Sequence, residues 1–232
     1  MVETKTPGRA KVESIKGLFA DISPTYDLMN SAMSFRLHHR WRRFAVRLLE
    51  LSPGESVLDL CCGTGDFGTA IRKVSGERPV VGLDFCMPML KVAASKRVPE
   101  FLALGDGCRL PVRSESVDAI TVGWGLRNVS DFKTALTEIF RVLKPGGRFV
   151  SLDMAVPKSA VAKSASKIAF HKMVPLMGAM LGQRRAYSYL PESTSTYLSR
   201  EDQKALMLGA GFKEVSIHDM FFGNICAHRG VK

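Results

Sequence analysis

The sequence lacks any apolar run close to the ~18 residues that a membrane-spanning helix needs. It has no Pro/Gly/Ser-rich linker, no internal repeat and no low-complexity segment, and its 5 cysteines include no C-x-x-C pair. These absences argue against a transmembrane protein, a metal site and a disulfide framework, and they indicate free thiols in a reducing compartment. Because residues 1–16 are polar and charged, we expect no secretory signal and a cytoplasmic location.

The chain is long enough to bury a sizeable core, with 232 residues of which 46% are hydrophobic. The absence of a linker predicts a single domain over residues 1–232. Within it we expect four parts: an N-terminal helical lid (1–50), a cofactor-binding core (51–154), a helical substrate-covering insertion (155–199) and a C-terminal helix with a strand pair (200–232).

The positive charge is unevenly distributed. The net charge of +11 divides into +4 over residues 1–50, +1 over residues 51–154 and +6 over residues 155–232. Two basic flanks around a nearly neutral centre are typical of a protein with an anionic partner, either a membrane surface or a nucleic acid. A surface that merely keeps the protein in solution is the other interpretation.

Glycine and aspartate mark the most informative stretch of the chain. The run VLDLCCGTGD over residues 57–66 carries Asp59 and ends in a glycine turn, and the run VVGLD over residues 80–84 ends in Asp84. Strand, glycine turn, helix, strand and acid in this order predict the start of a nucleotide-binding βαβ unit. An acid at the tip of the second strand can accept hydrogen bonds from both hydroxyls of a ribose.

This motif alone does not choose the nucleotide. Gly63, Gly65 and Gly68 also satisfy the G-x-G-x-x-G pattern with a following acid, as in an NAD-dependent oxidoreductase. A tight strand-to-helix turn without any ligand would also need these glycines. The choice depends on the rest of the chain.

The remaining pattern alternates strands and helices. Predicted strands span residues 55–60, 79–84, 100–104, 117–123, 148–154, 212–218 and 221–227. Predicted helices span residues 35–51, 66–74, 87–97, 131–143, 160–181 and 200–208, with Asp131 and Ser199 as N-caps. We therefore expect an α/β fold with helices on both faces of the sheet.

The end of the chain favours one class of this fold. Five parallel strands followed by an antiparallel hairpin are typical of the Rossmann-like fold of S-adenosylmethionine-dependent methyltransferases. Its sheet is seven-stranded and mostly parallel, with an antiparallel edge strand. A dehydrogenase would more often repeat a second βαβαβ half.

Two specific segments carry a family resemblance. Residues 19–30 (FADISPTYDLMN) and residues 125–129 (GLRNV) resemble signatures of the quinone-biosynthesis C-methyltransferases, which act on demethylmenaquinone and its ubiquinone and phylloquinone counterparts. The resemblance extends from Leu18 to Arg229. Further similar segments are Ser34-Phe35, residues 41–43, 143–147, 187–193 and 227–230.

The resemblance implies S-adenosylmethionine as cofactor, with Asp84 on the ribose and with Asp106 and Gly107 at the adenine. The full set of expected cofactor-binding residues is Asp59, Gly63, Thr64, Gly65, Asp84, Phe85, Asp106, Gly107 and Gly123. Two positions depart from the general pattern. Cys61 stands where methyltransferases have their first glycine, and Gly123 stands where many relatives have a serine.

The resemblance also implies catalysis of C-methylation on a prenylated quinol ring, most directly demethylmenaquinol to menaquinol, with a benzoquinol or phylloquinone precursor as the alternative. Three catalytic residues are expected. Arg127 would stabilise the oxyanion and orient a water, Asn128 would bind a quinol oxygen, and Tyr26 would close over the site. A salt bridge of Arg127 and simple packing of Tyr26 are the alternatives.

The flanks suit a substrate with a long apolar tail. A helix over residues 35–51 would place two stripes side by side, one apolar (Leu37, Trp41, Phe44, Leu48, Leu51) and one basic (Arg36, Arg40, Arg43, Arg47). Residues 160–181 repeat this arrangement. We expect peripheral binding to an anionic membrane surface, with ordinary helix packing or a homodimer interface as alternatives. A nucleic-acid partner, as in an RNA methyltransferase, is disfavoured because the basic helices lack a row of exposed aromatic residues.

Overall fold

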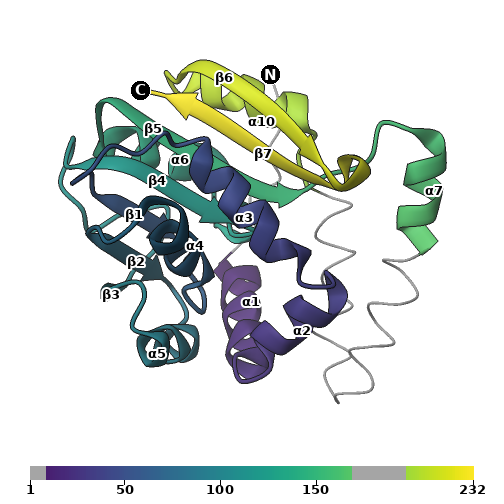
Figure 1. Ribbon diagram of the computed structural model, residues 1–232, viewed down its shortest axis with the longest axis horizontal. Helices are drawn as coiled ribbons and strands as arrows, with labels where there is room; N and C mark the ends of the chain where they lie inside the picture. Colours follow the sequence, from purple (N-terminus) through teal and green to yellow (C-terminus); the bar gives the residue numbers. More distant parts are fainter. Residues whose placement is uncertain (1–8, 169–196) are drawn as a thin grey trace.

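The computed structural model describes residues 9–168 and 197–232, drawn as ribbon in Figure 1. The helices are α1 (Arg9–Ile22), α2 (Tyr26–Met33), α3 (Leu37–Arg47), α4 (Asp66–Ser75), α5 (Met87–Lys96), α6 (Phe132–Val142), α7 (Ala160–Ile168) and α10 (Arg200–Gly209), with short 3-10 turns η1 (Leu126–Asn128) and η3 (Phe221–Gly223). The strands are β1 (Val57–Leu60), β2 (Val80–Asp84), β3 (Phe101–Leu104), β4 (Val117–Gly123), β5 (Leu143–Met154), β6 (Lys213–Met220) and β7 (Ile225–Val231).

Seven strands form one twisted sheet in the order β3-β2-β1-β4-β5-β7-β6. The first five strands pair in parallel, and β7 runs antiparallel to both of its neighbours, β5 and β6. The α/β class and the mostly parallel seven-stranded sheet are therefore confirmed. The reversed strand lies one place in from the edge, and β6 forms the edge itself.

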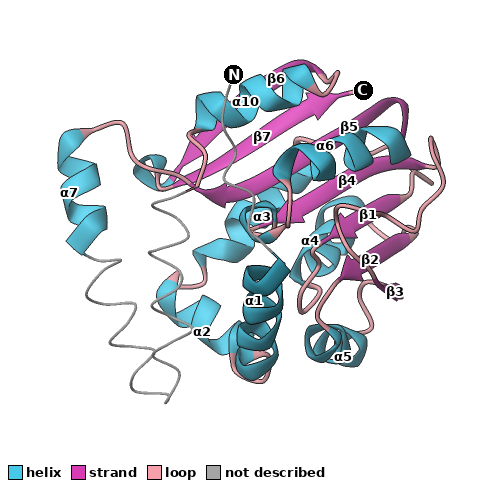
Figure 2. Cartoon of the chain, turned by 180° about the vertical axis from the view of Figure 1, so that it is seen from behind, coloured by secondary structure: helices cyan, strands magenta, loops and turns pink. Residues whose placement is uncertain are grey.

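Helices cover both faces of this sheet, as Figures 1 and 2 show from opposite sides. Helices α3 and α4 pack on one face, where Val46 and Ile71 meet the side chains of Val57 and Val150. Helices α6 and α10 pack on the other face. Because both faces are covered, β1 is buried along its whole length.

The predicted helix caps are present. The side chain of Asp131 accepts a hydrogen bond from the backbone N–H of Thr134 at 2.7 Å, and Ser199 Oγ accepts one from Asp202 at 3.1 Å. These bonds satisfy amide groups that lack a partner within the first turn of a helix. Each cap thus fixes where the chain leaves its loop and enters α6 or α10.

Four predicted boundaries differ from the structure. The last strand is residues 225–231 and not 221–227, because Phe221 and Phe222 adopt positive φ angles of 48° and 56° and turn the chain. Helix α3 begins at Leu37 and not at residue 35, because Phe35 and Arg36 adopt positive φ angles of 48° and 62°, and it ends at Arg47. Strand β5 begins at Leu143, directly after α6. The first part of the predicted helix over 160–181 is present as α7, residues 160–168. The rest of that prediction, residues 169–181, lies outside the described residues.

The N-terminal helices α1 and α2 lie across the end of the sheet where the parallel strands finish (Figure 1). Ile22 and Met29 pack with Cys86 and Met89 at the beginning of α5. This small cluster attaches the N-terminal helices to the loop that follows β2. The carboxyl ends of the strands are thereby covered by residues from the first part of the chain.

Candidate cofactor and methyl-transfer site

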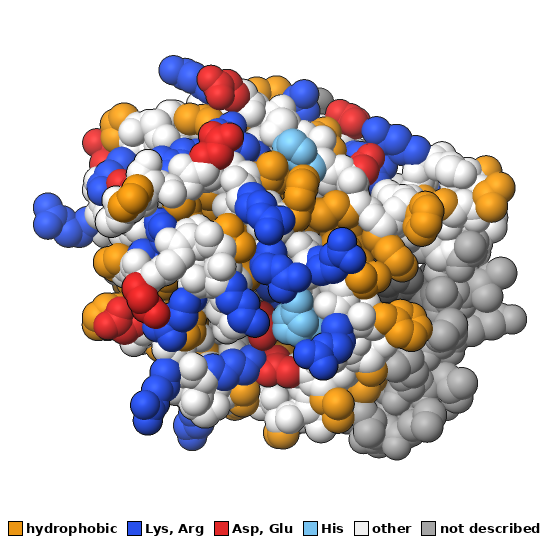
Figure 3. Space-filling model, in the orientation of Figure 1, with side chains coloured by type: hydrophobic (Ala, Val, Ile, Leu, Met, Phe, Trp, Pro, Cys, Tyr) orange, Lys and Arg blue, Asp and Glu red, His pale blue; other side chains and the backbone are white. Residues whose placement is uncertain are grey.

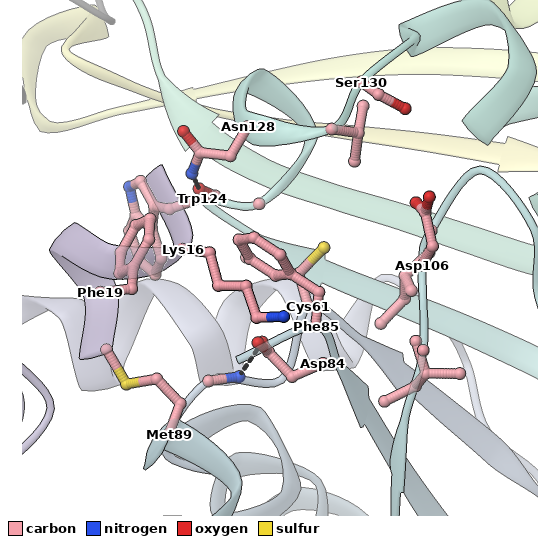
Figure 4. A pocket seen from close by; sticks show the side chains of 18 of the residues that line it. Lys16, Phe19, Cys61, Asp84, Phe85, Met89, Asp106, Trp124, Asn128 and Ser130 are labelled. Atoms are coloured by element: carbon pink, nitrogen blue, oxygen red, sulfur yellow. Dashed lines mark hydrogen bonds between the residues drawn. The ribbon is translucent and has the colours of Figure 1, made fainter. Parts of the chain in front are cut away.

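A cavity of about 240 Å³ lies at the carboxyl ends of β1, β2, β3 and β4, under helix α1 (Figure 4). This is where ligands bind in open α/β sheets, because the loops after neighbouring strands diverge there. The cavity is lined by Glu13, Lys16, Phe19, Tyr26, Leu60, Cys61, Gly63, Leu83, Asp84, Phe85, Met89, Gly105, Asp106, Gly107, Gly123, Trp124, Gly125, Asn128, Val129 and Ser130.

Asp84 connects two loops of this site. Its Oδ2 accepts a hydrogen bond from the N–H of Gly63 at 2.8 Å, and its Oδ1 accepts one from Cys86 at 2.9 Å. Burial raises the pKa of Asp84, and the backbone amides partly oppose this rise. Each carboxylate oxygen keeps a second acceptor position, so the side chain can also receive two ribose hydroxyls.

The backbone of the glycine turn explains two residue types. Gly65 has φ of 83°, and a Cβ there would lie 2.4 Å from the carbonyl oxygen of Val98. Cys61, at the position of the first family glycine, also has a positive φ, of 55°. A cysteine there carries backbone strain that a glycine would avoid.

The turn after β3 places Asp106 at the rim of the cavity. Its Oδ1 accepts a hydrogen bond from the N–H of Cys108 at 2.9 Å, and Gly107 lines the wall beside it. The Asp106 residue is exposed, so its carboxylate can both shape the turn and accept a hydrogen bond from a ligand. Phe85 and Met89 offer apolar surface on the neighbouring wall.

Asp59 lies beneath the cavity, not in its lining. The side chain is fully buried in β1, where Oδ1 accepts a hydrogen bond from the Thr121 hydroxyl at 2.9 Å and Oδ2 has no partner. Burial raises the pKa of Asp59 to about 7. An unpartnered buried carboxylate oxygen is costly, so this position favours either a bound proton or a nearby cation such as an ammonium group.

Thr64 is turned away from the cavity. Its hydroxyl donates to Asp27 Oδ1 at 2.6 Å, and Asp27 Oδ2 lies 2.5 Å from Lys96 Nζ. The same Lys96 ammonium contacts Asp66, which in turn is 3.2 Å from Arg42. This ion-pair network joins α2 to the glycine turn, to α3 and to α5.

His38 and His39 extend this network. Their ring nitrogens and the Asp66 carboxylate lie within 4.8 Å of one another, a distance that would suit a metal ion. The carboxylate, however, is already paired with Arg42 and Lys96. Burial and the Arg42 charge lower the pKa of His38 to about 4. We therefore assign the cluster to the ion-pair network.

Gly123 lies against a neighbouring aromatic ring. A Cβ at this position would lie 2.5 Å from Cε2 of Phe67, a buried residue of α4. A side chain at this position would force this ring to shift. Gly123 therefore lets Phe67, at the beginning of α4, pack closely against the end of β4.

Arg127 forms a buried ion pair. Its Nη1 donates to Oδ1 of Asp153 at the end of β5, and both side chains are about 5% exposed or less. Arg127 Nε and Asp153 Oδ2 have no hydrogen-bond partner. Burial raises the pKa of Asp153, although the Arg127 charge opposes this rise. The ion pair therefore leaves one donor, Arg127 Nε, and one acceptor, Asp153 Oδ2, without a hydrogen bond.

Of the three expected catalytic residues, two line the cavity and one does not. Tyr26 comes from α2, and burial raises the pKa of its phenol. Asn128, in η1, also lines the cavity, with Nδ2 donating to the carbonyl of Trp124 at 3.2 Å. Arg127 lies outside the lining, paired with Asp153. The cofactor residues Asp59, Thr64 and Gly65 also lie outside the lining.

Sequence reasoning missed several lining residues. Lys16 and Phe19 come from α1, and Figure 4 shows the Lys16 ammonium directed toward the Asp84 carboxylate. The sequence feature that could have found them is the helical spacing of the apolar residues Ile15, Leu18 and Ile22 among charged residues, which predicts an amphipathic helix here. Trp124, Cys61 and Ser130 also line the cavity. No local sequence motif marks Asp153 as part of the site, because its partner Arg127 lies 26 residues earlier in the chain.

The residues present fit S-adenosylmethionine. The Asp84 carboxylate can receive a ribose, the Phe85 and Met89 walls can hold adenine, and the unpartnered Oδ2 of Asp59 lies below the turn that faces the amino-acid end. Asp84 would receive the ribose of a dinucleotide equally well. What separates this sheet from the parallel sheet of a dinucleotide-binding domain is β7, which runs antiparallel to β5. The fold and this site define an S-adenosylmethionine-dependent methyltransferase.

The comparisons with known proteins identify the family. The profile of the ubiE/COQ5 methyltransferase family matches residues 7–232, and the chain belongs to this family. It is 39% identical to a demethylmenaquinone methyltransferase of Lactiplantibacillus plantarum, over 95% of this chain and 97% of the relative. It is 37% identical to the ubiquinone/menaquinone biosynthesis C-methyltransferase UbiE of Geobacter sulfurreducens, over 96% of this chain and 90% of the relative.

A solved structure shares the fold. An S-adenosylmethionine-dependent methyltransferase of Thermotoga maritima aligns with a TM-score of 0.64 and 20% identity, over 93% of this chain and 99% of that one. The expected family, fold and cofactor are thereby confirmed.

The buried carboxyl of Asp59 predicts a pH dependence of stability. Its pKa in the folded protein is about 7, above the value of about 3.9 in an unfolded chain, so the fold binds this proton more tightly. This contribution to the free energy of unfolding is fully present below pH ~4 and is lost as the pH rises through ~7. Asp59→Asn keeps an acceptor for Thr121 and removes the titration.

Urea unfolding without cofactor at pH 5 and pH 8 measures this effect. The stability of Asp59→Asn relative to the unmodified protein should rise between these two pH values. A constant difference would show that Asp59 does not titrate in this range.

Proposed function

We propose that this protein transfers the methyl group of S-adenosylmethionine to a ring carbon of a prenylated quinol, converting demethylmenaquinol to menaquinol. The observation that carries the proposal is the segment 125–129 directly after β4. It places Asn128 in the cavity wall and Arg127 in a buried pair with Asp153. The end-to-end similarity to demethylmenaquinone methyltransferases supports the same substrate class.

The reaction requires a carbon nucleophile. When bound, the cofactor supplies an electrophilic methyl group on a sulfonium sulfur. A quinol ring hydroxyl gives its proton to a base, and the negative charge spreads to the adjacent ring carbon. This carbon would take the methyl group that the bound cofactor supplies, leaving S-adenosylhomocysteine, and loss of the ring C–H proton would restore the aromatic ring. The protein must accept a proton, stabilise the oxyanion and align the two carbons.

The Arg127–Asp153 pair suits the proton step. A phenolic hydroxyl both donates and accepts, which complements the unpartnered Asp153 Oδ2 and Arg127 Nε. Because neither residue lines the cavity, we infer that Asp153 accepts the proton through a bridging water and that the Arg127 charge stabilises the resulting oxyanion. A guanidinium does not give up its own proton, so Arg127 is not the base. The raised pKa of Asp153 makes it a stronger base than an exposed carboxylate.

Asn128 and Tyr26 would position the ring. Asn128 carries an amide in the cavity wall, where its oxygen can accept a hydrogen bond from the second quinol hydroxyl. Tyr26 lines the cavity from α2, in edge contact with Phe19 at a centroid distance of 6.3 Å. These aromatic rings offer the apolar surface that a flat quinol needs.

We also propose a peripheral location on the cytoplasmic face of an anionic membrane, where a prenyl tail would lie. Among the described residues, none of the helices is long and apolar enough to cross a bilayer. A homodimer stays an untested prediction.

The substrate assay is methyl transfer from labelled S-adenosylmethionine to two short-tailed quinols offered in parallel. We expect turnover of demethylmenaquinol to exceed that of a demethoxy-type benzoquinol. The reverse order would assign the protein to the ubiquinone branch of the chemistry. Absence of transfer to either quinol, with the cofactor bound, would contradict the proposal.

Asp153→Asn tests the proton acceptor. We expect kcat to fall by at least ~100-fold, the range typical of a general base, with little change in cofactor affinity. In the unmodified protein kcat should decrease as the pH falls through the raised pKa of Asp153, because the base becomes protonated. This decrease should be absent from the residual activity of the variant.

Arg127→Lys should also be slow, because the point charge of an ammonium does not replace the planar guanidinium with its several donors.

Asp118→Asn is the matched control for Asp153→Asn: the Asp118 carboxylate is paired with Lys144 and lies at the opposite end of β4. Its turnover should stay normal. Normal turnover in Asp153→Asn would show that the pair is structural.

A further inference from the structure

One surface of the molecule combines exposed aromatic rings with unpaired arginines. The rings come from two separate parts of the chain, helix α3 with the turn before it and the 3-10 turn η3 between β6 and β7. We call this the aromatic–arginine surface, and it consists of Phe35, Arg36, Leu37, Arg40, Trp41, Arg43, Phe44, Arg47, Met220, Phe221 and Phe222. Figure 3 shows blue and orange side chains gathered over α3 and beside it.

The aromatic side chains of this surface are unusually exposed. Phe222 is 83% exposed and Phe35 is 79% exposed, whereas Trp41 and Phe44 are half-buried along a groove that also contains Phe221. The Trp41 and Phe221 rings lie 5.5 Å apart and the Phe221 and Phe222 rings 5.9 Å apart. Trp41, Phe221 and Phe222 thus form one row of rings that ends in the exposed Phe222. Exposed apolar surface of this kind is costly in water and marks a place where another apolar surface binds.

The arginines of this surface differ from those that form ion pairs elsewhere in the described residues. Within residues 9–168 and 197–232, ion pairs engage Arg42, Arg72, Arg127, Arg141, Arg148, Arg200 and Arg229. In the same ranges no ion pair involves Arg36, Arg40, Arg43 or Arg47. The last three lie on α3 and line the groove, and Arg36 directly precedes the helix. Their charge is therefore available to an anionic partner.

The position of the surface relates it to the site. Turn η3 is level with the carboxyl end of β5, since Met154 and Met220 both pair with Ile225. Helix α3 begins four residues after α2, which contributes Tyr26 to the cavity. In Figure 1 the beginning of α3 and η3 lie at the end of the sheet that α1 and α2 cover.

We propose that the aromatic–arginine surface docks the protein onto an anionic lipid bilayer, with Phe222 and Phe35 entering the interfacial layer. The arginines would bind lipid phosphates, and the aromatic rings would lie at the headgroup level, where such side chains are favoured. The inference rests on the proposed function in one respect, since a prenylated substrate gives the docking its purpose. The surface itself is defined by exposure and charge alone.

A single-stranded nucleic acid is the alternative partner for arginines and aromatic rings. Bases stack on rings whose faces are open and follow one another along a groove. Here the ring planes of Trp41 and Phe221 are inclined by 51°, and those of Phe221 and Phe222 by 55°, so the rings contact each other and form no flat platform. The observations therefore favour lipid.

The test is cosedimentation of the full chain with phosphatidylcholine vesicles, with and without phosphatidylglycerol. We expect binding only to the anionic vesicles, and release by salt. Arg36→Gln/Arg40→Gln should weaken binding about tenfold or more, because each basic residue near an anionic surface contributes a severalfold factor. The matched control is Arg113→Gln/Lys213→Gln, which removes the same charge from exposed positions at the other end of the sheet and should bind normally.

Phe222→Asn tests the insertion of the ring. Asparagine tolerates the positive φ of 56° at this position, so the turn should be preserved. We expect severalfold weaker vesicle binding, whereas Phe222→Leu should bind nearly as well as the unmodified protein. Trp41 reports depth, because in a Trp124→Phe background it is the sole tryptophan, and brominated lipids should quench its fluorescence.

Two results would overturn the docking proposal: no binding to anionic vesicles, or an equal loss in the arginine variant and its control. Tighter binding to a single-stranded RNA oligonucleotide than to vesicles would also overturn it in favour of nucleic acid. Failure of the proposed function is distinguishable. Vesicle binding without methylation of any quinol would leave the docking surface intact, and the surface variants should methylate a short-tailed quinol normally without vesicles.

Discussion

The carboxylate of Asp84 is the interaction on which the site depends. By accepting the amides of Gly63 and Cys86, it ties the glycine turn after β1 to the turn after β2. A buried carboxylate would be costly alone, and these amides compensate for part of its lost hydration. The two turns are therefore held apart at a fixed spacing, and the cavity forms between them. The same oxygens then face the place where a ribose would lie.

The N-terminal helices close this cavity through charges. Asp27 on α2 receives the hydroxyl of Thr64 and the ammonium of Lys96, while Lys96 also contacts Asp66 and thereby Arg42. Arg42 in turn lies over the ring of Trp124, 4.7 Å from its centroid, in the cavity wall. A single network thus joins the covering helices, the glycine turn and the wall, so the position of α2 and the shape of the site are coupled.

Sequence reasoning predicted what local patterns determine. Apolar runs, the glycine turn and the acid Asp84 were enough for the sheet and most of the cavity. It could not predict pairings between distant residues, such as Arg127 with Asp153 or Thr64 with Asp27, because neither pair has a fixed spacing. The strand after β6 was placed four residues too early, since Phe221 and Phe222 have β-forming side chains but turn the chain. That turn supplies exposed rings that the basic helix alone lacks.

The most direct test of this account is calorimetric titration with S-adenosylhomocysteine and with NADH. The account predicts binding of S-adenosylhomocysteine, absence of NADH binding, and a loss of about 10- to 100-fold in Asp84→Asn, because a charge-assisted hydrogen bond to the ribose contributes ~1.5–3 kcal/mol. The variant keeps an acceptor for one amide, and circular dichroism checks its fold. Unchanged affinity in a folded Asp84→Asn, or tight binding of NADH, would contradict the central role given to this carboxylate.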